Sequence, residues 1–158
     1  MTLDIVINAS PLILLSKTDR LYLLNKLFDK VFIPSAVLQE IKAIDEAEME
    51  VKLSEISFEQ IEVSNRIAIR GLLGRLHLGE VEVMVGALEK GVSTVVLDES
   101  SARNKAKQLG LEVTGTLGIL LKAQKQGLIE DIFQEITKLK QAGMYLSDGV
   151  IERIRNLL

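Results

Sequence analysis

Cysteine, tryptophan and long uncharged apolar runs are missing from this 158-residue sequence. Without cysteine the chain can form no disulfide, thiolate metal site or cysteine nucleophile. No stretch of about 20 residues is apolar enough to cross a membrane. The opening segment MTLDIVINAS has no basic residues ahead of its apolar ones, so we expect no signal peptide. These absences together predict a cytoplasmic protein that does not enter a membrane.

An excess of positive charge is also missing, and aromatic residues are few. The 19 Lys and Arg residues are outnumbered by 22 Asp and Glu residues, which gives a net charge of −3. Binding nucleic acid over a broad surface requires a basic face, so any nucleic acid would be held at a local patch, mainly through its phosphates. Aromatic residues make up only 4% of the chain, which argues against a platform that stacks a single strand.

Short apolar runs alternate with helical patterns along the whole chain. No flexible linker interrupts this alternation, so we expect one domain over residues 1–158. Apolar runs predict buried strands at 3–7, 31–33, 92–97 and 111–114, and an alternating run predicts an edge strand at 58–63. Helices are expected at 10–28 with a break near 18–19, from 34 onward, at 66–76 and 78–90, before 110, and at 116–126, 131–142 and 148–158. This alternation predicts an α/β fold with a central parallel sheet.

Two polar residues stand where predicted strands end. Asn8 follows the first apolar run, and Asp98 follows the run at 92–97. In an open α/β sheet the ligand crevice lies outside the carboxyl ends of the strands. We therefore expect both side chains to point into that crevice.

Helical geometry directs two glutamates toward the same crevice, because successive helical residues turn about 100°. Glu40 falls beside the apolar stripe predicted for its helix, which consists of Val37, Ile41 and Ile44. In the helix at 78–90 the apolar stripe consists of Val81, Met84, Val85 and Leu88. Glu80 lies beside Val83 and Ala87, about 160° from Glu82. Glu80 is therefore predicted to point inward, whereas Glu82 shares the solvated side with Glu89. A carboxylate set into an apolar face needs a partner.

Carboxylates that converge on one pocket need a cation or a shared proton. Two of them about 4 Å apart repel by about 4 kcal/mol at an effective dielectric of 20. Asn8, Glu40, Glu80 and Asp98 therefore suggest a divalent metal site and phosphoryl chemistry. Each also has an ordinary role available, since helix glutamates are commonly solvated, Asp98 could cap the following helix, and Asn8 could serve in a turn or cap. Four such residues aimed at one pocket favour the functional interpretation.

Two further residues are candidates for substrate contacts. Ser10 could bond to a carboxylate or a phosphate oxygen, or it could simply be the N-cap of a helix with Pro11 in its first turn. Arg103, one turn beyond Asp98, could contact the substrate backbone or be an ordinary solvated arginine. His77 is the sole histidine, and because no Ser/His/Asp arrangement is evident we leave it out of the site.

These residues fall within blocks of sequence whose order and spacing are more specific than any block alone. The blocks are NASPLI at 8–13, IPSAVLQE at 33–40, HLGEVE at 77–82, LDESSAR at 97–103, and GTLGILLKA at 115–123 followed by GLI at 127–129. Together they resemble the PIN-domain superfamily, and in particular the branch related to VapC-type toxin ribonucleases of toxin–antitoxin pairs. The resemblance covers nearly the whole chain except 45–75.

The resemblance implies a three-layer α/β/α fold, an acidic site that binds Mg²⁺ or Mn²⁺, and a nuclease that cuts RNA. Glu40, Glu80 and Asp98 match the second, third and fourth acidic positions of the family. Asn8 matches the first, where active nucleases have Asp; an amide oxygen can coordinate a metal but brings no charge and cannot act as a base. Relatives with Asn at this position look common in this branch, so two outcomes are open: the change is tolerated, or it marks reduced activity. The resemblance also implies a homodimer that binds a small antitoxin protein.

Two other interpretations remain open. The chain could be a PIN-like module that binds RNA or protein with little catalysis, which Asn8 and the acidic balance favour. It could instead be a receiver-like α/β protein with Asp98 as phosphoacceptor, although the acidic pair expected after the first strand is absent. Metal-dependent cleavage of RNA would distinguish a nuclease from the binding module. Metal-bound phosphorylation would reveal a receiver-like protein.

Overall fold

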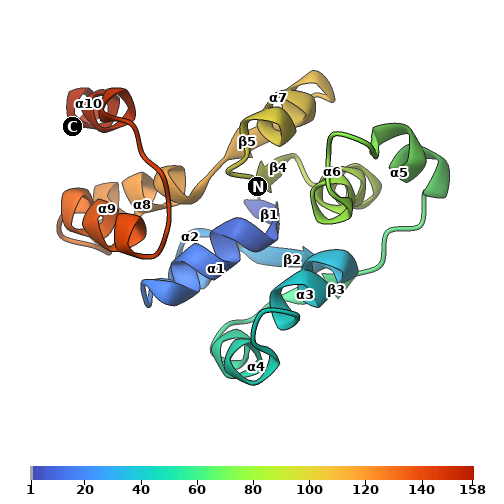
Figure 1. Ribbon diagram of the computed structural model, residues 1–158, viewed down its shortest axis with the longest axis horizontal. Helices are drawn as coiled ribbons and strands as arrows, with labels where there is room; N and C mark the ends of the chain where they lie inside the picture. Colours follow the sequence, from blue (N-terminus) through green and yellow to red (C-terminus); the bar gives the residue numbers. More distant parts are fainter. Residues whose placement is uncertain (1) are drawn as a thin grey trace.

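Residues 2–158 are described by the computed structural model, and within them five strands form a parallel sheet at the centre of the molecule (Figure 1). The strands are β1 (Asp4–Ile7), β2 (Lys30–Pro34), β3 (Glu59–Ile61), β4 (Thr94–Val96) and β5 (Glu112–Thr114). Their order is β3-β2-β1-β4-β5, and each neighbouring pair is parallel. The predicted α/β fold with a central parallel sheet is confirmed, and β3 is an edge strand as expected.

The central strand β1 fixes where a site can form. Ile5, Val6 and Ile7 have no exposed surface, as expected for a strand covered on both faces. β1 pairs with β2 through Ile5 and Val31 and with β4 through Val6 and Val95. From β1 the chain continues to β2 and then β3, which lie on one side of β1 in the sheet. From β4 it continues to β5, which lies on the other side. Such a switch point places a crevice at the carboxyl ends of β1 and β4.

Helices connect and flank the strands. Those before β4 are α1 (Ala9–Lys17), α2 (Leu23–Leu27), α3 (Ser35–Lys42), α4 (Glu46–Ser54), α5 (Arg66–Leu72) and α6 (Leu78–Lys90). Those after β4 are α7 (Ser100–Gln108), α8 (Thr116–Lys125), α9 (Ile132–Gln141) and α10 (Asp148–Leu157). α6 packs across β1, β2 and β4 and beside α3, whereas α8 packs against α1, α2 and β5. No helix within residues 2–158 is long and apolar enough to cross a membrane.

Local sequence sets several helix boundaries. α6 ends at Gly91, whose φ of +68° lies in the left-handed region that favours glycine. The predicted break after the first helix is confirmed, since the chain turns at Asp19 with a φ of +56°. The predicted start at Ser10 is wrong, because Asn8 is the N-cap and α1 begins at Ala9.

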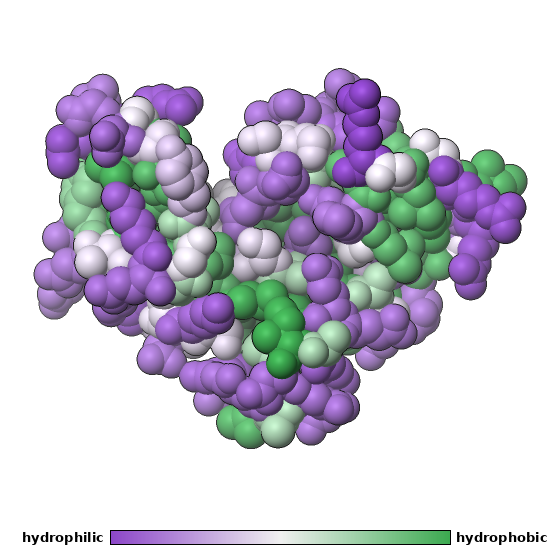
Figure 2. Space-filling model, in the orientation of Figure 1, coloured by the Kyte–Doolittle hydropathy of each residue, from purple (hydrophilic) through white to green (hydrophobic). Residues whose placement is uncertain are grey.

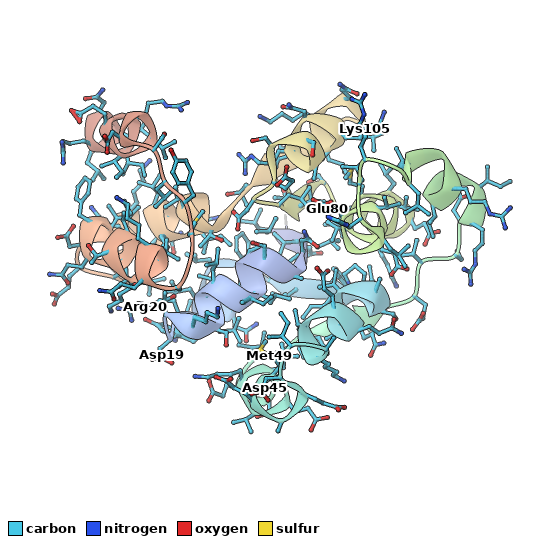
Figure 3. The ribbon with its side chains drawn as sticks, viewed as in Figure 1. Asp19, Arg20, Asp45, Met49, Glu80 and Lys105 are labelled. Carbon is cyan, nitrogen blue, oxygen red and sulfur yellow. The ribbon has the colours of Figure 1, made fainter. Side chains whose placement is uncertain are left out.

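A partly buried ion pair ties the C-terminal helices to α1. Arg20 follows α1 (Figure 3) and donates to Oε1 of Glu135 on α9 from Nε at 3.1 Å and from Nη2 at 2.7 Å. The hydrogen bond to Glu135 raises the pKa of Arg20. Lys138 adds a second cation, with its Nζ 3.6 Å from the same oxygen. The helix α9 is therefore held beside the end of α1.

Three helical-wheel predictions are wrong for residues outside the cleft. Ile44 is 65% exposed because α3 has already ended, and Leu88 is 51% exposed in the last turn of α6. Glu82 is half-buried and accepts a hydrogen bond of 3.1 Å from the backbone N–H of Ala36, in the first turn of α3. A carboxylate there satisfies a free N–H and is favoured by the helix dipole. Glu82 thus supports α3, the helix that carries Glu40.

Glu82→Ala should lower the free energy of unfolding by about 1–2 kcal/mol, because it removes a charge-assisted hydrogen bond at the α3 N-terminus. Urea denaturation followed by circular dichroism measures the change. Glu130→Ala is the matched control, since Glu130 is exposed and has no bonded partner within residues 2–158. It should stay within about 0.5 kcal/mol of the native chain. Equal effects of the two substitutions would contradict a capping role for Glu82.

Candidate metal centre

A cleft of about 640 Å³ opens at the carboxyl ends of β1 and β4, where the switch point predicts one. Figure 2 shows this face hollowed between the C-terminal helices at the left and α7. The cleft is lined by all four residues expected there, Asn8, Glu40, Glu80 and Asp98, and by Ser10. The prediction that these four side chains share one cleft is confirmed, whereas their chemical roles remain predictions.

Asn8 carries an unusual free oxygen. Its N–H extends the β1–β4 pairing by donating to the Val96 carbonyl at 3.1 Å. It is the N-cap of α1, yet its side chain makes no capping hydrogen bond. An N-cap side chain normally accepts from the N–H of the second or third helical residue. The third is Pro11, which has no N–H, and the N–H of the second, Ser10, makes no bond to the Asn8 side chain. Asn8 is 7% exposed and its Oδ1 has no hydrogen-bond partner among residues 2–158, an arrangement that costs about 1–3 kcal/mol.

Glu40 reaches the cleft from the last turn of α3, beside a glycine at the start of α6. It is exposed rather than set into an apolar face. A Cβ on Gly79 would come within 2.9 Å of Glu40 Oε2 and 3.5 Å of Asn8 Oδ1. Both oxygens therefore approach the same side of the Gly79 backbone, where the missing side chain leaves room for them.

Glu80 is the most enclosed of the three predicted carboxylates, with 5% of its surface exposed. Its Oε1 accepts a hydrogen bond of 3.0 Å from the backbone N–H of His77, which caps the start of α6. Figure 3 shows Glu80 near the centre of the molecule. Its burial confirms the helical-wheel prediction that Glu80 is the inward acid of this helix.

Asp98 is held through both carboxylate oxygens by one residue. The N–H of Thr116 donates to Oδ1 at 2.8 Å, and the Thr116 hydroxyl donates to Oδ2 at 2.7 Å. Asp98 thus caps α8 and not the helix that directly follows it, whose N-cap is Glu99. A carboxylate oxygen can accept more than one bond, so Asp98 retains capacity for a ligand in the cleft.

The two predicted substrate contacts differ in their placement. Ser10 is exposed on the cleft wall, and its hydroxyl has no bonded partner in the described part of the chain. Arg103 does not line the cleft, because its Nη1 donates to the Leu97 carbonyl at 2.8 Å. A Cβ on Gly115 would meet both this nitrogen, at 2.8 Å, and Asp98 Oδ1, at 2.7 Å. Arg103 therefore supports the end of β4 behind Asp98, and this geometry gives no support to a substrate contact.

Asn8, Glu40, Glu80 and Asp98 offer oxygen donors to the cleft, and such a set fits a hard divalent cation. Among residues 2–158 no three Asp, Glu or His side chains are close enough together to enclose an ion by themselves. Mg²⁺ keeps several waters and is usually bound through one or two carboxylates, so it does not require three such side chains. The free amide oxygen of Asn8 adds a neutral ligand. The residues present therefore fit a hydrated divalent ion.

Several residues that were not selected from the sequence also line the cleft, among them Arg75, His77, Glu99 and Tyr145. Glu99 could have been found, because it directly follows Asp98 at the same strand end. Arg75 and Tyr145 lie in loops, where apolar periodicity gives no orientation. His77 was left out of the site predicted from the sequence. Its hydrogen bond to Glu80 comes from the backbone N–H and not from the ring.

The fold and the cleft define an α/β protein with an acidic, oxygen-lined site at the switch point of a parallel sheet. A family model described as a PIN domain matches residues 4–158. The chain therefore belongs to the PIN-domain family, whose members are typically metal-dependent nucleases that bind divalent ions. A comparison with curated proteins finds no match. The narrower relation to VapC-type toxins remains a prediction.

Millimolar Mg²⁺ or Mn²⁺ should raise the Tm of the native chain, because the ion binds only the folded cleft. A tenfold excess over Kd adds about 1.4 kcal/mol to stability. Gly79→Ala should reduce this shift, since the new Cβ would meet Glu40 Oε2 at 2.9 Å and force that carboxylate to move, whereas Gly71→Ala should keep it, since its Cβ meets nothing within 4 Å. Thermal melts in metal and in EDTA measure both. An equal shift in the two variants would place the ion elsewhere.

Proposed function

We propose that this protein is a ribonuclease that hydrolyses RNA phosphodiester bonds with Mg²⁺ or Mn²⁺, at a rate reduced by the amide at position 8. Membership in the PIN-domain family supports the nuclease class. The observation that carries the proposal is the buried Oδ1 of Asn8, which lacks a partner and lines the same cleft as Glu40, Glu80 and Asp98. A cation accounts for both the free acceptor and the gathered carboxylates.

Glu80 and Asp98, with Glu40 directly or through water and the amide oxygen of Asn8, would hold the ion. Such an ion supplies an acidic bound water and positive charge beside the scissile phosphate. Thr116 fixes the Asp98 carboxylate through two hydrogen bonds, and the N-cap N–H of α6 fixes one oxygen of Glu80. Supporting bonds of this kind keep ligands oriented before the ion arrives.

RNA would be held at the cleft and not over a wide surface, because the chain carries a net charge of −3. The exposed hydroxyl of Ser10 is free to donate to a phosphate oxygen on the cleft wall. Contacts of this type position the backbone without reading the base sequence.

The finer biological role follows the resemblance to VapC-type proteins. The protein would be the toxin of a toxin–antitoxin pair, act in the cytoplasm, form a homodimer and bind a small antitoxin protein. The order of the sequence blocks and the family membership support this role.

A PIN-domain module that binds RNA or protein with little catalysis is the second candidate. The neutral side chain of Asn8 favours it, because an amide lowers the ligand charge and cannot accept a proton as a base. Both candidates use the same cleft, so activity measurements on position 8 separate them.

Asn8→Asp should raise metal-dependent cleavage of RNA about tenfold, equal to about 1.4 kcal/mol of the barrier. The new carboxylate adds charge to the ligand set with nearly the same shape, and hard cations gain from ligand charge. Adding Asp98→Asn should abolish the gain. Cleavage of a fluorescent RNA in Mn²⁺ measures each variant. Asn104→Asp is the matched control, because it adds the same charge at an exposed position on α7 that does not line the cleft.

Brisk cleavage by the native chain with no gain from Asn8→Asp would contradict reduced activity and identify the amide as a competent ligand. Metal binding by both forms without cleavage of RNA would favour the binding module. A gain from Asn104→Asp equal to that from Asn8→Asp would show that the charge does not act in the cleft.

A further inference from the structure

One aromatic and one basic side chain reach the cleft from loops that lie far apart in the sequence. Tyr145, between α9 and α10, and Arg75, between α5 and α6, both line it. The C-terminal helices lie at the left of Figure 1, and α5 and α6 lie at the right. The two loops therefore approach the acidic floor from opposite sides.

Tyr145 is held in its exposed position by its neighbours. Its surface is 86% exposed, whereas Leu146 is buried and Met144 packs against the core. The chain turns at Gly143, whose φ is +104°, and the N–H of Met144 donates to the Leu139 carbonyl at 2.9 Å. Because the loop is anchored on both sides, the fold itself presents the ring to the cleft.

The two tyrosines of the chain have different surroundings. Tyr22 is 40% exposed, and its hydroxyl accepts a hydrogen bond of 3.1 Å from Arg20. Tyr145 has no such bond in the described part of the chain. Leaving an aromatic ring in water gives up the stabilisation that burial provides. An anchored, exposed ring at the side of a polar cleft suits a planar ligand.

Arg75 supplies a positive charge at the other side. It is exposed and makes no hydrogen bond or ion pair within residues 2–158, although carboxylates line the same cleft. The next residue, Leu76, is buried, and a backbone bridge to Leu73 closes the loop. The guanidinium is therefore available to an anion, and its planar donors match a phosphate.

We propose that the cleft takes single-stranded RNA, with one base stacked on Tyr145 and a phosphate bound by Arg75, so that the backbone between them crosses the acidic floor. The inference rests on the proposed ribonuclease function and names its substrate class. Stacking on a side chain requires a base that is free of its duplex neighbours. The ring thus selects single strands, a choice that the charge of Arg75 alone would not make.

Binding in Ca²⁺ tests this arrangement. Fluorescence anisotropy would follow a labelled short single-stranded RNA and a duplex of the same sequence. Ca²⁺ is a hard cation that neutralises the acidic floor, and reading binding in place of cleavage keeps the result independent of nuclease activity. Circular dichroism would establish that each variant is folded.

Tyr145→Ala should weaken single-strand binding about tenfold, whereas Tyr145→Phe should bind as the native chain does, because it keeps the ring. Arg75→Ala should also weaken binding and reduce the slope of log K against log salt by about 0.7. The matched controls lie on α5 outside the cleft. Ile67→Ala removes an apolar side chain of 85% exposure, and Arg70→Ala removes one positive charge, and both should leave binding unchanged.

Native affinity in Tyr145→Ala, or an equal loss in Tyr145→Phe, would overturn the stacking role. Absence of single-strand binding by the native chain, or an equal effect of Tyr145→Ala on the duplex, would overturn it as well. If the predicted pattern appears but Mn²⁺ supports no cleavage, the binding arrangement stands and the ribonuclease proposal fails. If RNA is cleaved but neither binding nor cleavage depends on Tyr145, the ribonuclease proposal stands and the binding arrangement fails.

Discussion

The pairing of β1 with β4 is the constraint on which the site depends. It sets two strand ends side by side at the switch point, and the hydrogen bond from Asn8 to the Val96 carbonyl fixes the first residue beyond β1. Pro11, the third residue of α1, has no N–H, so it removes one of the two donors from which an N-cap side chain normally accepts a hydrogen bond. The Asn8 oxygen is left free and buried where the carboxylates gather.

Helix N-termini supply much of the support around that oxygen. Asn8 is the N-cap of α1, Glu80 closes the first turn of α6, and Asp98 caps α8 through Thr116. The positive end of a helix dipole favours a carboxylate without cancelling its charge. This explains how Glu80 and Asp98 can stay charged within one cleft. Their carboxylates are oriented by backbone groups and a hydroxyl, and they remain available to a cation.

The sequence predicted the parts of the structure that local periodicity controls. Strand ends follow from apolar runs and wheel positions from the period of 3.6 residues, which is why Asn8, Glu80 and Asp98 were placed correctly. The partners of a side chain depend on elements distant in sequence, so the bond from Ala36 to Glu82 and the bond from Arg103 to Leu97 could not be inferred. The scarcity of aromatic residues also hid Tyr145, because composition does not reveal where a single ring will lie.

Titration with Mn²⁺ followed by NMR tests the central claim most directly. The side-chain NH₂ group of Asn8 is observable, and a paramagnetic ion bound by the neighbouring oxygen would broaden its signals. The account predicts that these signals are lost at substoichiometric Mn²⁺, while those of Asn25 and Asn65, which do not line the cleft, persist. Loss of all three sets together, or an unchanged Asn8 at saturating Mn²⁺, would contradict a metal centre at the β1–β4 switch point.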